Sequence, residues 1–467
     1  MALVARRYDL DVRISPSPIA AVPDAPGSLD ATCDLLISNA GARPVSTVPL
    51  LLYRLLHVER ATDTRDPGAP VATRQSIRPL YGQSALQVNS VSVRLRTPLD
   101  PGAETTLRLT YGGSPVGYRE VMPYVHDSVQ SNFAVLRPEV LWYPVLGSAT
   151  PKTYRQAWSV PEASVKIQLP EGWRAFLPPA RARSGPDGTD LFTFAGWTQG
   201  LHLFAGAFET SQMHVLTVYH LPGRSGWAFG VASAAEFALG ELAAWLGPQA
   251  MARRDVAFLE LPAGWGSQHL PGLIAQTVAD DPAAAFAEVV HEVAHFWTPG
   301  RDPNRFCDEA IAHYLEDLLC SAKGGTGAWQ AAVARRMQAL REHPHALSVP
   351  LALATESEEL DAVSRQKGPL ALAVLERGIG RAAVFELLRA WLASPASAEG
   401  DAMDFVQHVS KELSQPRNFD TSRFLREWFL GQCTPELALA EPPEFALTQA
   451  ANRYALAPSA EADRVRS

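Results

Sequence analysis

The sequence predicts a multidomain protein in which an all-β sandwich is followed by a mainly helical α+β domain. The chain has 467 residues, 47% of them hydrophobic, so it can form the cores of two or three domains. Residues 8–208 contain short strand-like runs separated by turn residues. From residue 281 onward the apolar positions recur with helical spacing.

The expected sandwich spans residues 1–211. Residues 8–14 and 106–111 alternate apolar and polar side chains, as a strand with one buried face does. Pro, Gly and Asp separate such runs, for example at residues 99–102. Many short strands punctuated by turns are typical of a β-sandwich.

The second expected domain spans residues 212–440. It begins with a strand at residues 215–219 and a long helix over residues 229–246. Glu236 and Glu241 interrupt the apolar residues of this helix, which favours an amphipathic helix over a membrane span. Several helices follow. Beyond residue 441 the chain is rich in Pro and Ala, and residues 441–467 are expected to form a flexible tail.

Charge and cysteine content exclude some classes of function. The formal net charge of −8 argues against nucleic acid or an anionic membrane as a partner. The four cysteines have no metal-binding or redox spacing, which favours a reducing compartment. The amino terminus lacks the apolar segment of a signal peptide. We therefore expect a cytoplasmic protein without a membrane span, and leave open its oligomeric state and any attachment to a membrane partner.

The most informative motif is His-Glu-Val-Ala-His at residues 291–295. On a helix, His291 and His295 lie about 40° apart around the axis. Both imidazoles can then bind one tetrahedral metal ion, and Zn²⁺ is the usual one. Glu292 lies beside them, where it can accept a proton from a water molecule. The alternative is a pair of surface histidines on an amphipathic helix.

A helix is predicted around this motif. Asp281 and Pro282 give an N-cap and a first helical residue. Thr298, Pro299 and Gly300 are expected to end the helix. The histidines lie opposite an apolar stripe formed by Phe286, Val289, Val290, Val293 and Phe296.

A catalytic zinc ion normally has three protein ligands and one open position. Glu309 is the candidate third ligand, because a second helical stretch at residues 306–322 would run antiparallel to the first. His313, one turn later, is a rival that would give a three-histidine site. Cys307 is also close, although a buried structural thiol is the favoured interpretation.

These residues resemble the gluzincin zinc aminopeptidases of the membrane alanyl aminopeptidase type. That family has HExxH, a spacer of about eighteen residues, and a glutamate in a Leu-Asn-Glu-Gly-like stretch. Here thirteen residues, 296–308, separate the motif from Glu309, and Tyr314 matches an aromatic position of the family. The resemblance implies a β-sandwich followed by a thermolysin-like catalytic domain, one Zn²⁺ ion and peptide hydrolysis.

A second stretch carries the resemblance. Gly-Trp-Gly-Ser-Gln stands where the family has its Gly-Ala-Met-Glu-Asn substrate strand, which implies an edge strand that pairs with the substrate backbone. Ser267 replaces the glutamate that holds the substrate α-amino group, and no acidic residue follows residues 142–145 until Glu162. Strict aminopeptidase specificity is therefore not implied. The expected substrate-binding residues are Gly264, Trp265, Gly266, Ser267 and Gln268.

Arg365 stands where the family has a tyrosine, two residues before a Lys-Gly pair that is Lys367 and Gly368 here. The tyrosine hydroxyl stabilises the tetrahedral intermediate, and no tyrosine lies between Tyr314 and Tyr454. A guanidinium group can replace it because it is always charged and has several N–H donors. A surface arginine at a helix start is the alternative.

The predicted function is that of a zinc metallopeptidase with Glu292 as general base and a peptide or small amide as substrate. Two alternatives stay open. One is an inactive pseudo-peptidase that keeps zinc and binds peptides or a protein partner. The other is a hydrolase of an amide bond in a small metabolite.

Overall fold

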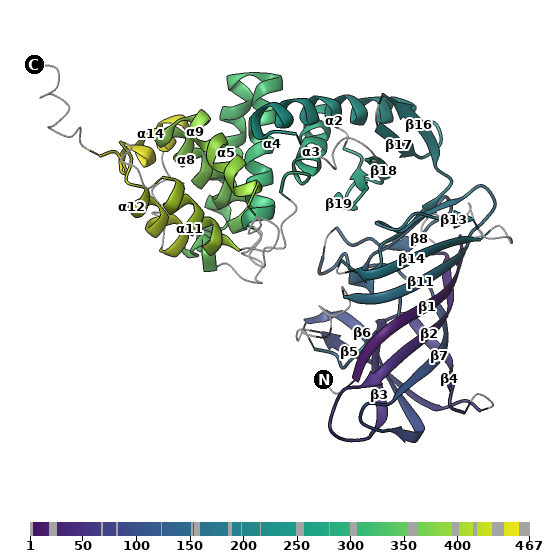
Figure 1. The fold of residues 1–467 in the computed structure, drawn as a ribbon. Helices are drawn as coiled ribbons and strands as arrows, with labels where there is room; N and C mark the ends of the chain where they lie inside the picture. Colours follow the sequence, from purple (N-terminus) through teal and green to yellow (C-terminus); the bar gives the residue numbers. More distant parts are fainter. Residues whose placement is uncertain are drawn as a thin grey trace, which may run out of the picture. The chain divides into compact units, whose positions relative to one another are not determined.

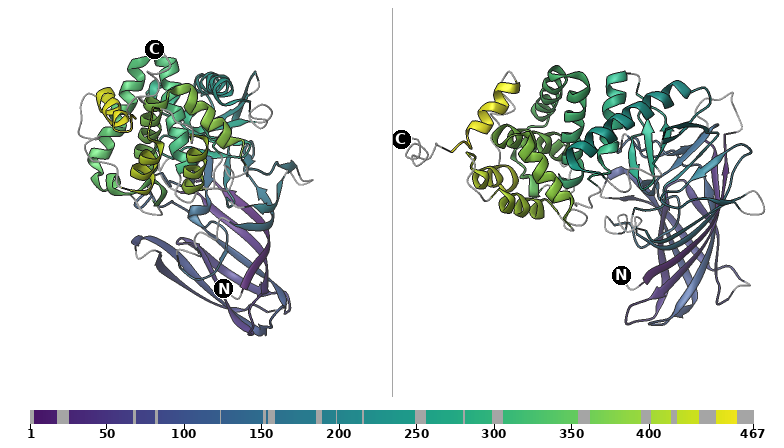
Figure 2. Two further views of the ribbon diagram at one scale, coloured as in Figure 1. Left: turned by 60° about the vertical axis from the view of Figure 1, so that its left-hand side comes forward. Right: turned by 45° about the horizontal axis from the view of Figure 1, so that its top comes forward.

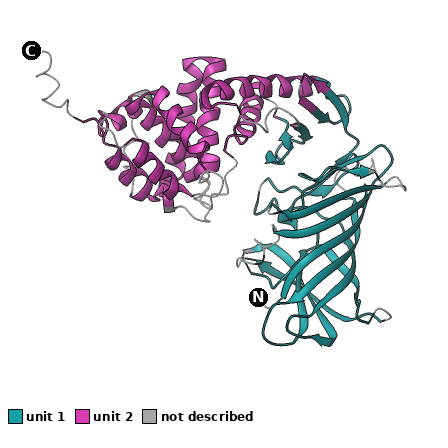
Figure 3. Ribbon diagram, viewed as in Figure 1, with its two compact units in different colours: residues 1–211, 218–225, 257–278 teal, residues 212–217, 226–256, 279–467 magenta. Residues whose placement is uncertain are grey.

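The computed structural model divides the chain into two compact units (Figures 1 and 3). The first unit comprises Met1–Ser211, Val218–Ser225 and Ala257–Val278. The second comprises Gln212–Thr217, Gly226–Val256 and Ala279–Ser467. The residues that the structure describes are 3–17, 26–66, 69–80, 83–122, 124–150, 153, 159–184, 189–197, 199–214, 216–248, 256–279, 281–298, 306–353, 362–394, 401–413, 418–431 and 443–456.

The first unit contains a seven-stranded sheet of order β13-β14-β11-β1-β2-β7-β4. β1 is antiparallel to β2, with Leu10 opposite Cys33, and parallel to β11. In β1 the side chains of Tyr8, Leu10, Val12 and Ile14 are buried, so the predicted alternation is present. The strands are β1 (Leu3–Ser15), β2 (Ser28–Asn39), β4 (Leu56–Asp63), β7 (Glu104–Gly113), β11 (Val160–Gln168), β13 (Arg183–Ser184) and β14 (Asp190–Trp197).

Two four-stranded sheets complete the β-rich part. The first has the order β10-β3-β6-β5, and its buried residues share one hydrophobic core with those of the large sheet. The second has the order β12-β15-β9-β8. The predicted β-rich amino-terminal part is thus confirmed. The strands are β3 (Val45–Tyr53), β5 (Ala72–Leu80), β6 (Gln83–Leu99), β8 (Ser128–Val129), β9 (Phe133–Leu136), β10 (Val145–Leu146), β12 (Arg174–Phe176) and β15 (Leu203–Gly206), with a short helix η1 (Pro138–Val140) after β9.

A five-stranded sheet of order β16-β17-β18-β20-β19 follows. β18 and β20 are parallel, and β19 is the edge strand, antiparallel to β20. All five residues of β20 are buried. The strands are β16 (Glu209–Met213), β17 (Leu216–His220), β18 (Ala257–Leu261), β19 (Gln268–Leu270) and β20 (Leu273–Thr277).

The second unit is mainly helical, as predicted (Figure 2). α4 packs against α3, α5 and α8, so it lies at the centre of this unit. The helices are α2 (Ser225–Leu246), α3 (Pro282–Ala294), η3 (Phe306–Ala310), α4 (Ile311–Gly324), α5 (Thr326–Glu342), α6 (Pro344–Ser348), η4 (Leu351–Leu353), η5 (Val363–Lys367), α8 (Gly368–Ile379), α9 (Arg381–Leu392), α11 (Ala402–Glu412), α12 (Thr421–Leu425), η6 (Arg426–Leu430) and α14 (Pro443–Asn452).

The long helix α2 has the length and apolar composition of a membrane span. The mean hydropathy of its most apolar window is 1.2, and 39% of that window is buried inside the protein. Core helices of soluble proteins meet the same criteria, so this composition is weak evidence for a membrane span.

The carboxyl-terminal segment corrects one expectation. A flexible tail is predicted from residue 441, but α14 forms there and packs against α5 and α8. Ala446 and Leu447 are buried, and so is Tyr454 beyond the helix. The small and apolar residues that suggest a tail instead form one side of a docked helix. Residues 457–467 lie outside the described residues.

Candidate metal centre

The helix that carries the two histidines begins as its sequence predicts. The Asp281 side chain accepts a hydrogen bond of 2.9 Å from the Ala284 N–H, and Pro282 is the first helical residue. α3 ends at Ala294 and His295 is its C-cap, so the helix is shorter than expected. Pro299 and Gly300, which were expected to end it, lie outside the described residues.

The polar residues of the motif are buried, which distinguishes them from a pair of surface histidines. His291, Glu292 and His295 are 9%, 6% and 7% exposed. The sequence places these histidines away from the core that the apolar stripe buries. The structure covers this second face as well, because α3 packs against α4. Ionisable groups buried in this way need charged or metal partners.

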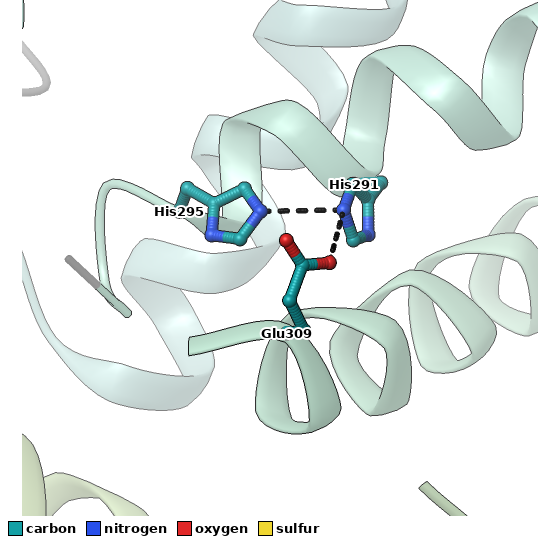
Figure 4. Close-up of side chains that lie close together, drawn as sticks. All are labelled: His291, His295 and Glu309. Carbon is teal, nitrogen blue, oxygen red and sulfur yellow. Dashed lines mark hydrogen bonds and ion pairs between the residues drawn. The ribbon is translucent and has the colours of Figure 1, made fainter. Parts of the chain in front are cut away.

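Three donor atoms converge here (Figure 4). The Nε2 atoms of His291 and His295 are 3.2 Å apart, and His291 Nε2 lies 3.6 Å from Glu309 Oε2. One donor atom from each of these residues lies within 4.8 Å of the other two. Ligands bound to one tetrahedral zinc ion are separated by about 3.4 Å. The nitrogen, nitrogen and carboxylate donors of this group fit one Zn²⁺ ion.

The outer nitrogen of each imidazole faces a carboxylate. His291 Nδ1 lies 3.3 Å from Glu316 Oε2, and His295 Nδ1 lies 2.8 Å from Asp308 Oδ1. Such partners fix the ring orientation and direct the other nitrogen to the metal. Sequence reasoning did not assign these roles to Asp308 and Glu316. The available signal was their position on the same predicted helix as Glu309.

Glu309 lies in η3, a π-helical turn that leads directly into α4. The predicted second helical stretch is therefore present, although its first turn is wider than an α-helix. Such turns are frequent at functional sites, because they shift a side chain relative to the helix that follows. Glu309 is 5% exposed.

His313 lies beside the group of three donors. Its Nδ1 is 2.6 Å from Glu316 Oε2, and its Nε2 is 3.8 Å from Glu309 Oε2. Among the described residues, His313 forms a second group of possible metal ligands with His291 and Glu316. Burial and the charge of His291 lower the pKa of His313 to about 3. Cys307 is hydrogen-bonded through its thiol to the Asp401 carbonyl.

The environment of this site shifts the pKa values of its ionisable groups. Burial lowers the pKa of His291, but hydrogen bonds to Glu309 and Glu316 outweigh this effect and raise the pKa to about 10. Burial raises the pKa of Glu292, while His291 and His295 oppose that rise. A carboxyl group with a raised pKa is suited to accept and return a proton near neutral pH.

Arg365 lies close to the metal group. Its Nε is 4.0 Å from Glu309 Oε2, and its side chain is 42% exposed. The residues after it have structural contacts. Lys367 is buried and donates a hydrogen bond to the Leu347 carbonyl. A Cβ atom at Gly368 would lie 2.4 Å from the Cβ atom of Ala310, so only glycine permits this approach of α8 to η3.

The predicted substrate strand is mostly a turn, which corrects the sequence expectation. Gly264 and Gly266 have φ values of 82° and 67°, and such angles interrupt an extended backbone. Of the five expected substrate-binding residues, only Gln268 belongs to the edge strand β19.

The side chain of Ser267 has partners in the neighbouring strand β20. Its Oγ accepts hydrogen bonds from the Thr277 backbone N–H at 3.0 Å and from the Gln276 side-chain amide at 3.1 Å. The Ser267 hydroxyl therefore stabilises the turn.

Trp265 ties this turn to an earlier part of the first unit. Its ring stacks on His126 at 5.7 Å and contacts Phe133 edge-on at 5.2 Å. Its carbonyl accepts a hydrogen bond from the buried guanidinium of Arg137, which lies 128 positions earlier in the sequence. Nothing in the local sequence pattern predicts this contact.

Comparison with known proteins supports the fold. Neither a family model nor the sequence of a characterised protein matches the chain. The crystal structure of an M1 zinc metallopeptidase from Deinococcus radiodurans has a TM-score of 0.58 and 21% identity, with 93% of this chain and 95% of that chain covered.

Two related structures contain ligands. A variant of the Deinococcus radiodurans M1 zinc metallopeptidase bound to a Tyr-Ser-Ala substrate has a TM-score of 0.56 at 21% identity. A two-domain M1 zinc metallopeptidase variant bound to L-arginine has a TM-score of 0.55 at 20% identity. In both cases 93% of this chain and 95% of that chain are covered. The resemblance inferred from the motifs is thus confirmed at the level of the fold.

Proposed function

We propose that the protein is a zinc-dependent hydrolase of peptide bonds. The observation that carries this proposal is the buried group of His291, His295 and Glu309 with Glu292 adjacent to it. Zinc binding alone needs no base at position 292. A glutamate buried beside the metal ligands has a chemical role in hydrolysis, whereas a structural metal site would gain nothing from it.

The chain supplies the metal ligands, a general base and a donor to the developing oxyanion. A zinc ion held by His291, His295 and Glu309 would supply Lewis-acid chemistry, polarising a carbonyl group and making water more acidic. Glu292 accepts a proton from the attacking water and returns it to the leaving amine. The Arg365 guanidinium donates N–H groups to the negative charge that develops on the carbonyl oxygen.

For substrate binding we propose the turn that contains Gly264, Trp265 and Gly266, together with Ser267 and Gln268. The support is the resemblance of this stretch and the edge position of β19, whose backbone can pair with an extended peptide. The Ser267 hydroxyl is already hydrogen-bonded to Gln276 and Thr277 at the end of β20, so it is a poor anchor for an ammonium group. We therefore propose a peptide or small amide substrate without a strict requirement for a free amino terminus.

The similar structures support this substrate class in general terms. One contains a Tyr-Ser-Ala substrate and others contain L-arginine or L-tryptophan. Those ligands belong to the proteins in which they were observed. For this chain they favour peptides over other amides as the first substrates to assay. A cytoplasmic location and the absence of a nucleic-acid partner remain predictions from composition.

A second candidate function is a zinc-retaining pseudo-peptidase that binds peptides or a partner protein. Arg365 at the tyrosine position and Ser267 at the glutamate position favour it. The buried Glu292 opposes it, because a binding module gains nothing from a desolvated carboxylate.

Measuring peptide hydrolysis by the variants Glu292→Gln and Glu288→Gln distinguishes a peptidase from a zinc-binding pseudo-peptidase. Zinc-loaded wild-type protein and both variants would be assayed with fluorogenic aminoacyl substrates and internally quenched peptides. Glu288 lies one turn earlier on α3, outside the group of ligands, and serves as the matched control. We expect Glu292→Gln to lower kcat by about 10²–10⁴ and Glu288→Gln to leave it unchanged. Equal trace rates in all three proteins would favour the binding module.

Acetylated substrates test the remaining specificity question. Each peptide would be compared with its N-acetylated form at equal concentration. We expect similar values of kcat/KM, because no free carboxylate is assigned to the amino group. A loss of turnover on acetylation would instead establish a strict aminopeptidase.

A further inference from the structure

A buried arginine of the second unit links the helix of the metal ligands to the segment of Arg365. Arg336 lies on α5 and is 7% exposed. Its guanidinium contacts α4 on one side and η5 on the other. Arg336 has no role in the proposed reaction.

The contacts with α4 fix the orientation of the guanidinium. Arg336 Nε donates to Asp317 Oδ2 at 2.6 Å, and Nη2 donates to Asp317 Oδ1 at 2.9 Å. Nη2 also donates to the His313 carbonyl at 3.0 Å and lies 3.9 Å from Glu316 Oε2. A paired, bidentate contact of this kind leaves the planar group little freedom.

The contact with η5 uses the remaining nitrogen. Arg336 Nη1 donates a hydrogen bond to the Arg365 carbonyl and lies 3.5 Å from Gln366 Oε1. The Arg365 side chain is partly exposed, with its Nε 4.0 Å from Glu309 Oε2. The backbone of Arg365 is therefore attached, through Arg336, to the helix that follows Glu309 and contains Glu316.

We propose that Arg336 is a positioning residue that holds Arg365 beside the metal centre. This inference rests on the proposed function, in which Arg365 donates to the developing oxyanion. Only a guanidinium can bind a carboxylate with two nitrogens and a backbone carbonyl with the third, because its donors lie in one rigid plane. A lysine ammonium keeps the charge but cannot hold both partners in this geometry.

A purely structural ion pair between α4 and α5 is the competing explanation. It predicts that the loss of Arg336 lowers stability and affects catalysis independently of Arg365. A positioning role predicts that the effect of Arg336 on catalysis depends on the Arg365 side chain. Once the Arg365 side chain is removed, a further change at Arg336 has no side chain left to misplace.

A double-mutant cycle with Arg336→Lys and Arg365→Ala distinguishes the two explanations. The control is Arg335→Lys, because Arg335 is the exposed neighbour on α5. We would measure kcat, KM, bound zinc and the melting temperature of each variant with one internally quenched peptide. We expect Arg335→Lys to leave all four unchanged. We expect Arg336→Lys to lower kcat by up to about 10²-fold, with KM and zinc content retained.

The decisive comparison is the double variant. We expect Arg365→Ala to lower kcat by about 10²–10³, and Arg336→Lys to add no further loss in that background. Fully multiplicative losses, or unchanged kcat in Arg336→Lys, would overturn the inference.

If Arg336→Lys loses zinc or fails to fold, Asp317→Asn provides a second cycle with Arg365→Ala. This variant weakens the anchor of Arg336 but keeps the guanidinium. We expect its kcat loss to vanish in the Arg365→Ala background, and an independent loss would overturn the inference. The proposed function is tested separately by the loss of activity in Glu292→Gln, so the two failures are distinguishable.

Discussion

The Nε2 atom of His291 lies 3.2 Å from the Nε2 atom of His295. Their Nδ1 atoms face Glu316 and Asp308 respectively, so both inner nitrogens are directed toward the same point. Metal binding requires both imidazoles in their neutral form, and the two inner lone pairs then face one position from which a cation can bind both. The relationship between these two rings is therefore the structural basis for the zinc site.

The outer carboxylates should tune the affinity for zinc. Asp308→Asn and Glu316→Gln keep the shape of each side chain but remove the charge that orients a histidine. We expect each to weaken zinc binding by about 10–100-fold. Competition with a zinc chelator of known affinity measures this change. Glu342→Gln, at an exposed position on α5, is the control. Equal affinities in all three variants would contradict the role of the outer carboxylates.

Zinc affinity should increase with pH. In the metal-free protein Glu309 and Glu316 overcome the effect of burial and raise the pKa of His291 to about 10. His291 is therefore protonated near pH 7, and zinc must displace that proton. We expect the apparent affinity to rise by about tenfold per pH unit from pH 7 toward pH 9. Calorimetry in buffers of different ionisation enthalpy should also detect the proton release. A zinc affinity that does not change with pH would contradict this prediction.

The same pKa predicts the stability of the metal-free protein. The folded pKa of His291 exceeds the ordinary value of 6.5. The stabilisation is therefore complete below about pH 6.5 and is lost as the pH rises toward about 10. Denaturant unfolding of chelator-treated protein at pH 7 and pH 9.5 measures this loss. His291→Ala should abolish the part of the pH dependence that His291 contributes, and an unchanged dependence in the variant would refute it.

The ion pair of Arg137 and Asp127 should be far more important for stability than a surface pair. Both side chains are fully buried and lie 3.4 Å apart. Arg137→Met leaves the buried Asp127 carboxylate without its charged partner, although the backbone N–H of residue 137 still donates to it, and such a loss typically costs about 3–5 kcal/mol. Arg108→Met, which removes an exposed pair with Asp34, should cost about 1 kcal/mol or less. Denaturant unfolding measures the free energy of unfolding of both variants. A small and equal decrease in the two variants would show that the buried pair is unimportant.

Burial of Glu139 makes the stability of the first unit depend on pH as well. Burial is the main cause that raises the pKa of Glu139 to about 7, and Asp127 adds to it while Arg137 opposes it. The folded state thus disfavours the ionised form, so the free energy of unfolding should fall as the pH rises from about 4.5 to about 7. Glu139→Gln should remove this fall. Unfolding measured at pH 5 and pH 8 checks it, and equal pH slopes in variant and wild type would contradict it.

Local sequence signals predicted the elements of the metal centre. The Asp281 cap, the HExxH spacing and the helical stretch around Glu309 depend on residues close together in the chain, so periodicity and capping rules detect them. The β-rich amino-terminal part was predictable for the same reason. The resemblance added Arg365, whose position near Glu309 no local pattern indicates.

Contacts between distant segments escaped sequence reasoning. The bonds from Arg336 to the segment of Arg365 and from Arg137 to the carbonyl of Trp265 form only after elements pack together. The sequence suggests a strand at residues 264–268, because it does not show that Gly264 and Gly266 adopt positive φ and form a turn. The helix α14 was missed because its burial depends on α5 and α8.

Elemental analysis of purified protein tests the central claim most directly. Wild type, His295→Ala and Glu292→Gln would be dialysed against limiting chelator, and their zinc content would be measured per chain. We predict about one zinc ion per chain in wild type and Glu292→Gln, and a large loss in His295→Ala. Wild-type protein without stoichiometric zinc, or His295→Ala with undiminished zinc, would contradict the account.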